Sequence, residues 1–282
     1  MTTEEMNGPQ VPIDPPQPGC VEGSSGPGAA PRSPPPPWRM GAARAWLIFA
    51  SYLGVQLAIG LAVGVAVSVA YFARHGLGRH SALPVDVNRS IVIAGGVGGM
   101  VGAALVAYWL ARRAARREPG LVRAIGWSGA TPRVRTFAVL WGVALGIAFL
   151  TLFAIFPPPK DFHPGAILDA LNAGGWVVAL WVLVAIAIAP PVEEFVFRGV
   201  MWTGLSRSWG GGAAGAVVTV VFVALHFPET RTYVPAIAAI TGLGLSTLAI
   251  RRLSRSLVPS VLLHASYNGV MVLSFFAGLA AR

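Results

Sequence analysis

Seven apolar stretches recur along this chain, and each has the roughly 17 or more residues that an α-helix needs to cross a membrane. Only 11% of the residues are charged, whereas soluble domains carry about 25%. The composition therefore predicts an all-α membrane protein, a polytopic bundle of transmembrane helices. The stretches cover residues 45–73, 90–111, 136–157, 174–206, 211–227, 233–250 and 256–280.

The first 40 residues differ from the rest of the chain. Proline and glycine dominate them and large apolar side chains are almost absent, so burial cannot offset the entropy of ordering. We expect residues 1–40 to form a disordered cytoplasmic tail. The single Cys20 excludes an intramolecular disulfide and a cysteine-rich zinc site.

The basic residues predict the orientation of the spans. Threading the seven stretches alternately places fourteen basic loop residues on one side of the membrane and six on the other. The positive-inside rule then predicts a multi-pass protein of the plasma membrane with a cytoplasmic N-terminus. The formal net charge of +10 is explained by these flanking arginines, so no nucleic-acid partner is expected.

A run of glycines lies in the second stretch. Gly95 and Gly99 are four residues apart, as are Gly98 and Gly102, and small residues at this spacing let helices approach closely. Packing within the bundle is the favoured interpretation over formation of a homodimer. The oligomeric state is left open.

Polar residues inside the apolar stretches are few, and they are confined to the second half of the chain. Nine of the eleven acidic residues lie in the tail or loops, which leaves Glu193 and Glu194, and Arg198 is the only basic residue well inside a stretch. Two of the five histidines, His226 and His264, also fall within stretches. Ionisable groups at bilayer depth are costly and usually mark a functional site.

These polar residues share a similar depth in the membrane. At about 1.5 Å per residue, Glu194 lies roughly 20 Å from the loop at 207–211, and His226 lies roughly 22 Å from the same loop. His264 and Asn268 lie roughly 12 and 18 Å from Ser256. We therefore expect one polar cavity between three helices, to which Glu193 also contributes.

Spacing predicts local contacts as well. Glu194 and Arg198 are separated by one helical turn and can form an ion pair, which leaves Glu193 as the freer carboxylate. Pro190 and Pro191 have no N–H, so the carbonyls of Ile186 and Ala187 are expected to lose their helical partners. A kink with a nearby polar group is predicted just before the glutamates.

The chain resembles the CPBP family of intramembrane proteases, also called Abi, which includes CAAX prenyl proteases and bacteriocin-processing enzymes. The similarity covers about residues 174–275. It implies a helix bundle with a catalytic part at 174–280 that follows N-terminal transmembrane helices at 41–173. Because family cores have eight helices, it also implies an eighth, at about 164–173. The family motifs EExxxR, FxxxH and HxxxN appear in order as Glu193, Glu194 and Arg198, then Phe222 and His226, then His264 and Asn268.

The resemblance implies an intramembrane endopeptidase that hydrolyses a peptide bond of a membrane-associated protein or peptide. Glu193 would activate a water, with His226 polarising it. His264 and Asn268 would donate to the oxyanion, and Arg198 would hold Glu194. One zinc ion bound by Glu193, His226 and His264, or no metal at all, are both compatible with the motifs.

Two other classes of protein would also bury such residues. A non-catalytic membrane scaffold or immunity factor would keep the family's fold without turnover. A proton-coupled transporter would place Glu, His and Arg at mid-membrane, but the sequence shows no inverted repeat. Twenty arginines against one lysine indicate a GC-rich bacterial genome, so we expect a substrate other than a prenylated CAAX protein.

Overall fold

The computed structural model of the chain describes residues 40–76, 85–117, 123–127, 129–160, 162 and 175–280. These residues are helical apart from short connections, and no strand occurs among them. The predicted tail at 1–40, except Met40, and the eighth helix at 164–173 lie outside the described residues. The elements are α1 (Ala42–His75), α2 (Val85–Arg117), α4 (Pro132–Ile155), α6 (Gly175–Leu183), η1 (Val184–Ile188), α7 (Ala189–Glu194), η2 (Phe195–Met201), α8 (Trp202–Thr230), α9 (Val234–Ser254) and α10 (Leu257–Ala280), where η marks a π-helix.

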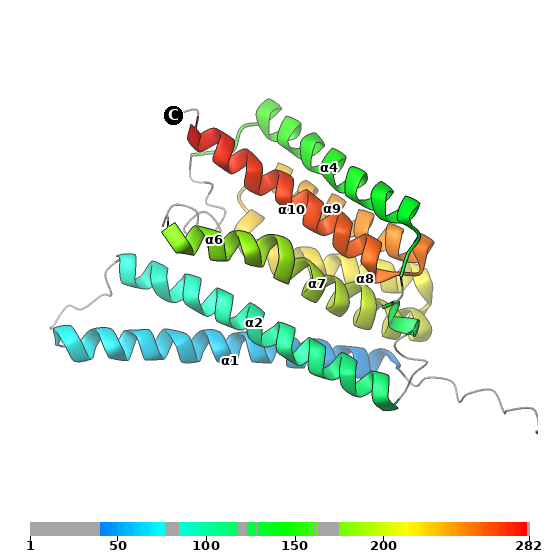
Figure 1. Ribbon diagram of the computed structural model, residues 1–282, viewed down its shortest axis with the longest axis horizontal. Coiled ribbons are helices and arrows are strands. Elements are labelled where there is room, and N and C mark those ends of the chain that lie inside the picture. The colour runs from blue at the N-terminus through cyan, green and yellow to red at the C-terminus, as the bar shows by residue number, and fades with distance from the viewer. Residues whose placement is uncertain are drawn as a thin grey trace, which may run out of the picture. The chain divides into compact units, whose positions relative to one another are not determined.

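The helices follow the seven predicted apolar stretches, so the all-α fold class is confirmed (Figure 1). Elements α6 to α8 run on without a loop, but the backbone of Gly210 has φ +78° and ψ 164° inside α8. Glycine adopts this conformation without the strain that a Cβ would cause. The break divides α8 where the sequence predicts a loop between two spans.

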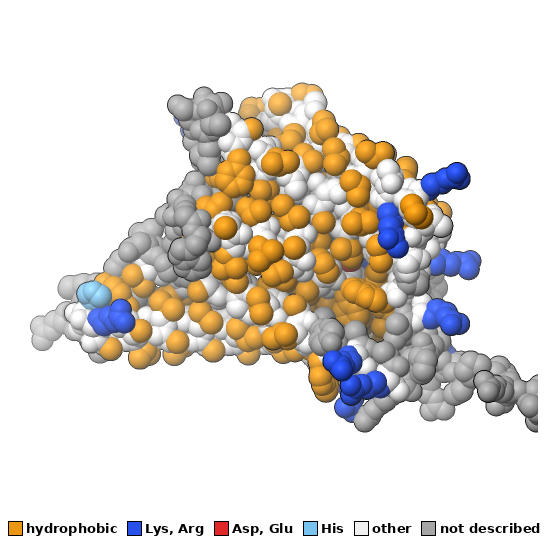
Figure 2. All heavy atoms as spheres, in the orientation of Figure 1, with side chains coloured by type: hydrophobic (Ala, Val, Ile, Leu, Met, Phe, Trp, Pro, Cys, Tyr) orange, Lys and Arg blue, Asp and Glu red, His pale blue; other side chains and the backbone are white. Residues whose placement is uncertain are grey.

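Five continuous helical segments in the described residues are long and apolar enough to cross a membrane. One of them, Val177–Thr230, contains two of the predicted spans because it runs through the break at Gly210. Within α2, the apolar stretch Ile93–Val106 is shorter than these five segments and is not among them. Hydrophobic side chains cover the flank of the molecule that Figure 2 shows, and lysine and arginine side chains gather mainly at one end.

Glycines set the close packing of two helix pairs. A Cβ on Gly95 would lie 3.3 Å from the carbonyl oxygen of Gly60, and a Cβ on Gly99 would lie 3.1 Å from that of Gln56. The glycine run of α2 therefore packs on α1, which confirms packing within the bundle. In α4, a Cβ on Gly142 would lie only 2.3 Å from the carbonyl oxygen of Leu263 in α10.

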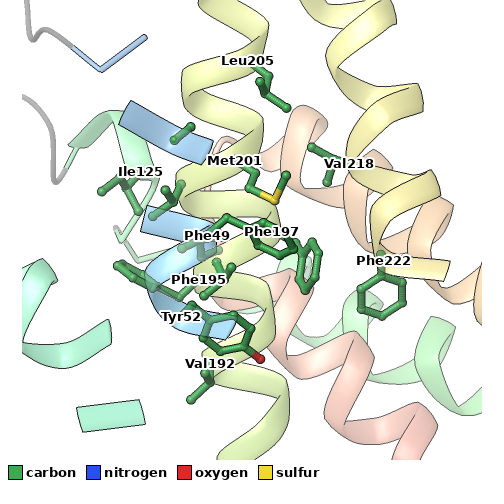
Figure 3. Close-up of a cluster of buried hydrophobic side chains, with 14 of the residues drawn as sticks. Phe49, Tyr52, Ile125, Val192, Phe195, Phe197, Met201, Leu205, Val218 and Phe222 are labelled. Atoms are coloured by element: carbon green, nitrogen blue, oxygen red, sulfur yellow. The ribbon is translucent and has the colours of Figure 1, made fainter. Parts of the chain in front are cut away.

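The buried core joins α1 to the segment that carries the glutamates. Phe49 of α1 contacts Phe197 of η2 edge-on at 5.8 Å between ring centroids, and Phe197 contacts Phe222 of α8 at 5.2 Å. Figure 3 shows these rings together, with Phe195 and Tyr52 nearby. Each of the three phenylalanines is at most 6% exposed. Phe222 also lies against Arg198 and near His264, so this aromatic core borders the polar residues.

Candidate active site

The segment before the glutamates is widened into a π-helix. The N–H of Ala189 bonds to the carbonyl of Val184, five residues earlier. In this register the next N–H would serve the carbonyl of Ala185, but that position is Pro190, which has no N–H. The side chain of Asn268 fills the gap, because its Nδ2 donates to the Ala185 oxygen at 2.8 Å.

This contact corrects one detail of the sequence prediction and bears on another. A polar partner before the glutamates is present, but it bonds to Ala185, because in the π register the two prolines face the carbonyls of Ala185 and Ile186 rather than those of Ile186 and Ala187. The carbonyl of Ile186 faces a proline in either register, as predicted. Asn268, expected to donate to an oxyanion, has one N–H committed to the backbone.

A second π-helix follows the glutamates. The N–H of Trp202 bonds to the carbonyl of Phe197, again five residues back. Short π segments within helices occur frequently at functional sites because they re-aim side chains. All seven residues of η2 are buried, Arg198 among them.

Arg198 is enclosed on every side. Its Nη1 donates to Oε1 of Glu194 at 3.1 Å, and its Nη2 donates to the carbonyl of Gly244 in α9 at 3.0 Å. The guanidinium lies 4.3 Å from the centre of the Phe222 ring, which supplies a cation–π contact. Both members of the Glu194–Arg198 pair are fully buried. Arg198 therefore pairs with Glu194 and ties η2 to α9.

Glycine leaves room where Arg198 and Phe222 meet α9. A Cβ on Gly244 would lie 3.5 Å from Nη2 of Arg198 and 3.3 Å from the ring of Phe222. The sequence analysis missed Gly244, because a backbone carbonyl acts here and no side chain marks it. The only signal is the small residue itself in the apolar run Leu243–Leu245.

His264 lies between the two glutamates. Its Nδ1 is 2.9 Å from Oε1 of Glu194, and its Nε2 is 3.9 Å from Oε2 of Glu193. A carboxylate can only accept a hydrogen bond, so Nδ1 carries the proton. In the neutral ring, Nε2 then presents its lone pair toward Glu193. Glu194 thereby fixes both the tautomer and the orientation of His264.

Glu193 is the more accessible carboxylate. Its side chain is 13% exposed, whereas that of Glu194 is fully buried. Oε2 of Glu193 is nevertheless buried and accepts no hydrogen bond from the described residues. A buried carboxylate oxygen without a donor is costly, so this atom is suited to hold a water or a substrate group.

His226 is connected to the cluster of glutamates and His264 through Phe222. Its Nδ1 is 2.8 Å from the carbonyl of Phe222, which can only accept, so Nδ1 carries the proton here as well. The Phe222 ring lies 4.7 Å from the ring of His226 and 6.1 Å from that of His264. Glu229, one turn beyond His226, interacts electrostatically with both His226 and Glu193. No direct contact joins His226 to either glutamate among the described residues.

Tyr52 of helix α1 also lies near Glu193, although α1 was predicted to lie outside the catalytic part. Tyr52 is 4% exposed and interacts electrostatically with Glu193. Its hydroxyl accepts a hydrogen bond from Nε2 of Gln56 at 3.2 Å, so the hydroxyl proton remains for another acceptor. No sequence motif marks Tyr52.

The six predicted site residues therefore fall into three groups. Glu193, Glu194, Arg198 and His264 form one connected cluster. His226 joins it through Phe222, and Asn268 supports the preceding π-helix. A search of the described residues finds no group of three or more His, Cys, Asp or Glu side chains placed to hold a metal ion. Nδ1 of both histidines is already engaged, so only their Nε2 atoms remain for other partners.

Comparison with known proteins gives one match. Residues 175–270 match the family model described as "Type II CAAX prenyl endopeptidase Rce1-like". The match covers every residue of the cluster together with His226 and Asn268. No curated protein and no solved structure matches the chain.

Proposed function

Because residues 175–270 form an Rce1-like domain of the type II CAAX prenyl endopeptidase family, we propose that this chain is an intramembrane endopeptidase. Its substrate is a membrane-associated protein or peptide, hydrolysed within the helix bundle. One observation carries the proposal: Oε2 of Glu193 is buried without a donor and lies 3.9 Å from Nε2 of His264.

The geometry supports activation of a water by Glu193. Oε2 of Glu193 and Nε2 of His264 are 3.9 Å apart, and a water at about 2.8 Å from each would donate one hydrogen to each acceptor. Glu193 takes a proton from this water as the oxygen attacks the peptide carbonyl. The same proton then passes to the leaving nitrogen, so the elements of water are divided between the two products.

Glu194 and Arg198 act by positioning rather than by proton transfer to the substrate. The Glu194 carboxylate of this pair accepts the Nδ1 proton of His264, which fixes the orientation of the ring and keeps its Nε2 facing Glu193. Nε2 of that ring accepts the second hydrogen of the water and so orients the water for attack on the carbonyl. Asn268 holds the π-helix before the glutamates, and His226 presents Nε2 for polarising the water.

The described His, Cys, Asp and Glu side chains are not grouped around one point, so the steps above use only protein groups and water. If zinc binds, Glu193 and the Nε2 atoms of His226 and His264 are the ligands that would hold it, and zinc would acidify the bound water. We further propose that the protein lies in a bacterial plasma membrane with a cytoplasmic N-terminus.

The substitution Glu193→Gln tests the proposal, because glutamine keeps the shape but accepts no proton at neutral pH. Cleavage should fall by roughly 10²-fold or more while the protein level is unchanged. The readout is a comparison of membrane peptides from cells that express either form, measured beside the protein level. Arg133→Gln is the control, since Arg133 is exposed in the first turn of α4 and belongs to neither the cluster nor its neighbours. Full cleavage by well-expressed Glu193→Gln would refute the mechanism.

A further inference from the structure

A polar pocket lies away from the glutamates. It has a volume of about 450 Å³, opens to the surface, and is lined by Ala124, Trp202, Thr203, Ser206, Arg207 and Arg251. It shares no residue with the cluster around Glu193. Its walls come from the helical turn at 123–125, the first turns of α8 and the last turn of α9.

Arg251 is a buried residue in the wall of this pocket. It is 5% exposed, and its Nη2 donates to the carbonyl of Ala124 at 2.9 Å. Its Nε is buried and finds no acceptor among the described residues, and none of their carboxylates pairs with it. A buried guanidinium without a counter-charge is costly, so an anion bound in the pocket would stabilise it.

The backbone is shaped around this arginine. Gly126 has φ +82°, and a Cβ there would lie 2.6 Å from Cζ of Arg251. The amide of Leu257 bonds to the carbonyl of Gly126 at 2.8 Å, which holds the turn in place. The turn at 123–127 therefore covers the guanidinium and keeps it inside the pocket wall.

Two more arginines add positive charge. Arg207 lines the pocket, and the guanidinium of Arg252 lies 5.4 Å from the ring centre of Trp202, another lining residue. The hydroxyls of Thr203 and Ser206 donate to the carbonyls of Ala124 and Thr203 at 3.3 and 3.4 Å. The pocket therefore attracts its ligand through guanidinium groups, which match the geometry of a phosphate.

Exposed apolar side chains close in sequence to the arginines indicate a lipid as the source of the phosphate. Leu253, next to Arg252, is 86% exposed, and Trp209, two residues after Arg207, is 47% exposed. Exposed apolar and aromatic side chains alternating with arginines are typical of the membrane–water interface, where lipid phosphates lie.

We propose that this pocket binds the phosphate group of an anionic membrane lipid. Basic pockets between membrane-spanning helices commonly bind such headgroups. The proposal does not depend on peptidase activity. Free phosphate offers the same chemistry, and the experiment separates the two sources.

The test uses the full chain in a neutral detergent. Binding of phosphatidylglycerol in mixed micelles is measured by native mass spectrometry, with inorganic phosphate as a competitor and phosphatidylcholine as a reference lipid. Arg207→Gln should weaken binding about tenfold, the loss expected for one charge-assisted hydrogen bond. The matched control is Arg133→Gln, because Arg133 is exposed in the first turn of α4 and does not line the pocket. It should change binding by less than about twofold.

Arg251→Lys supplies a second test, since lysine keeps the charge and loses the fork that reaches Ala124. Arg251→Lys should also weaken binding. If the Arg251→Lys variant does not fold, the result with Arg207→Gln alone decides. If inorganic phosphate displaces the lipid, the phosphate group alone is sufficient for binding. If the lipid stays bound, the intact headgroup is recognised. Either result supports the site. Equal affinity of the unaltered chain and Arg207→Gln, or an equal loss with Arg133→Gln, overturns the proposal.

Discussion

Nδ1 of His264 lies 2.9 Å from Oε1 of Glu194, the same oxygen that accepts a hydrogen bond from Arg198. One carboxylate oxygen thus links helices α7, η2 and α10. Because Glu194 is fully buried, its charge acts on His264 through a medium that screens poorly. Glu193, which has no such partners, is left for chemistry.

The first prediction concerns His264 and Glu193 as a unit. His264→Ala should lower cleavage by roughly 10²-fold or more, and combining it with Glu193→Gln should add little, because residues that act together are not additive. The measurement is peptide cleavage by single and double variants at equal protein level. Multiplication of the two losses in the double variant would show that the residues act independently.

Arg198 should behave differently, because its loss leaves Glu194 buried without a cation. Arg198→Ala should lower the free energy of unfolding by about 3–5 kcal/mol as well as lowering activity. Arg198→Lys should recover only part of this, since lysine cannot reach Glu194 and the Gly244 carbonyl with a planar fork. Thermal unfolding in detergent checks both, with the exposed Arg133→Ala as control. Unchanged stability of Arg198→Ala would argue against a structural ion pair.

Substitution of Asn268 distinguishes a structural role from hydrogen-bond donation to the oxyanion. Asn268→Leu removes the donor to the Ala185 carbonyl and should lower the free energy of unfolding by about 1–3 kcal/mol. Ser274→Ala on the same helix is the control, because Ser274 bonds only to the carbonyl of Met271 within its own turn. A loss of kcat with unchanged stability in Asn268→Leu would instead favour donation to the oxyanion.

The orientation in the membrane is a prediction from arginine distribution. In a chain with Cys20→Ser, a cysteine introduced as Arg123→Cys should react with a membrane-impermeant reagent only after the membrane is opened. Position 123 belongs to the arginine-rich side, which the positive-inside rule places in the cytoplasm. Preferential labelling of this position in intact cells would reverse the threading.

The sequence by itself determined the helical class and the positions of the spans. Backbone groups in lipid must bond within their own helix, so apolar length translates directly into a helix, as α1, α4 and α10 illustrate. The sequence also determined which side chains belong to the candidate site, because charge inside an apolar stretch is rare enough to mark Glu193, Glu194 and Arg198. The pairing of Glu194 with Arg198 followed from their spacing on one helix.

Only the tertiary structure decided the partners that lie far away in sequence. Asn268 bonds to a carbonyl 83 residues earlier, and Arg198 bonds to one 46 residues later. Neither carbonyl is marked by its own side chain. The π register that exposes the Ala185 oxygen is likewise set by packing and by Pro190 rather than by hydrophobic periodicity. Backbone acceptors carry no sequence signal, so their roles appear only when the helices are placed side by side.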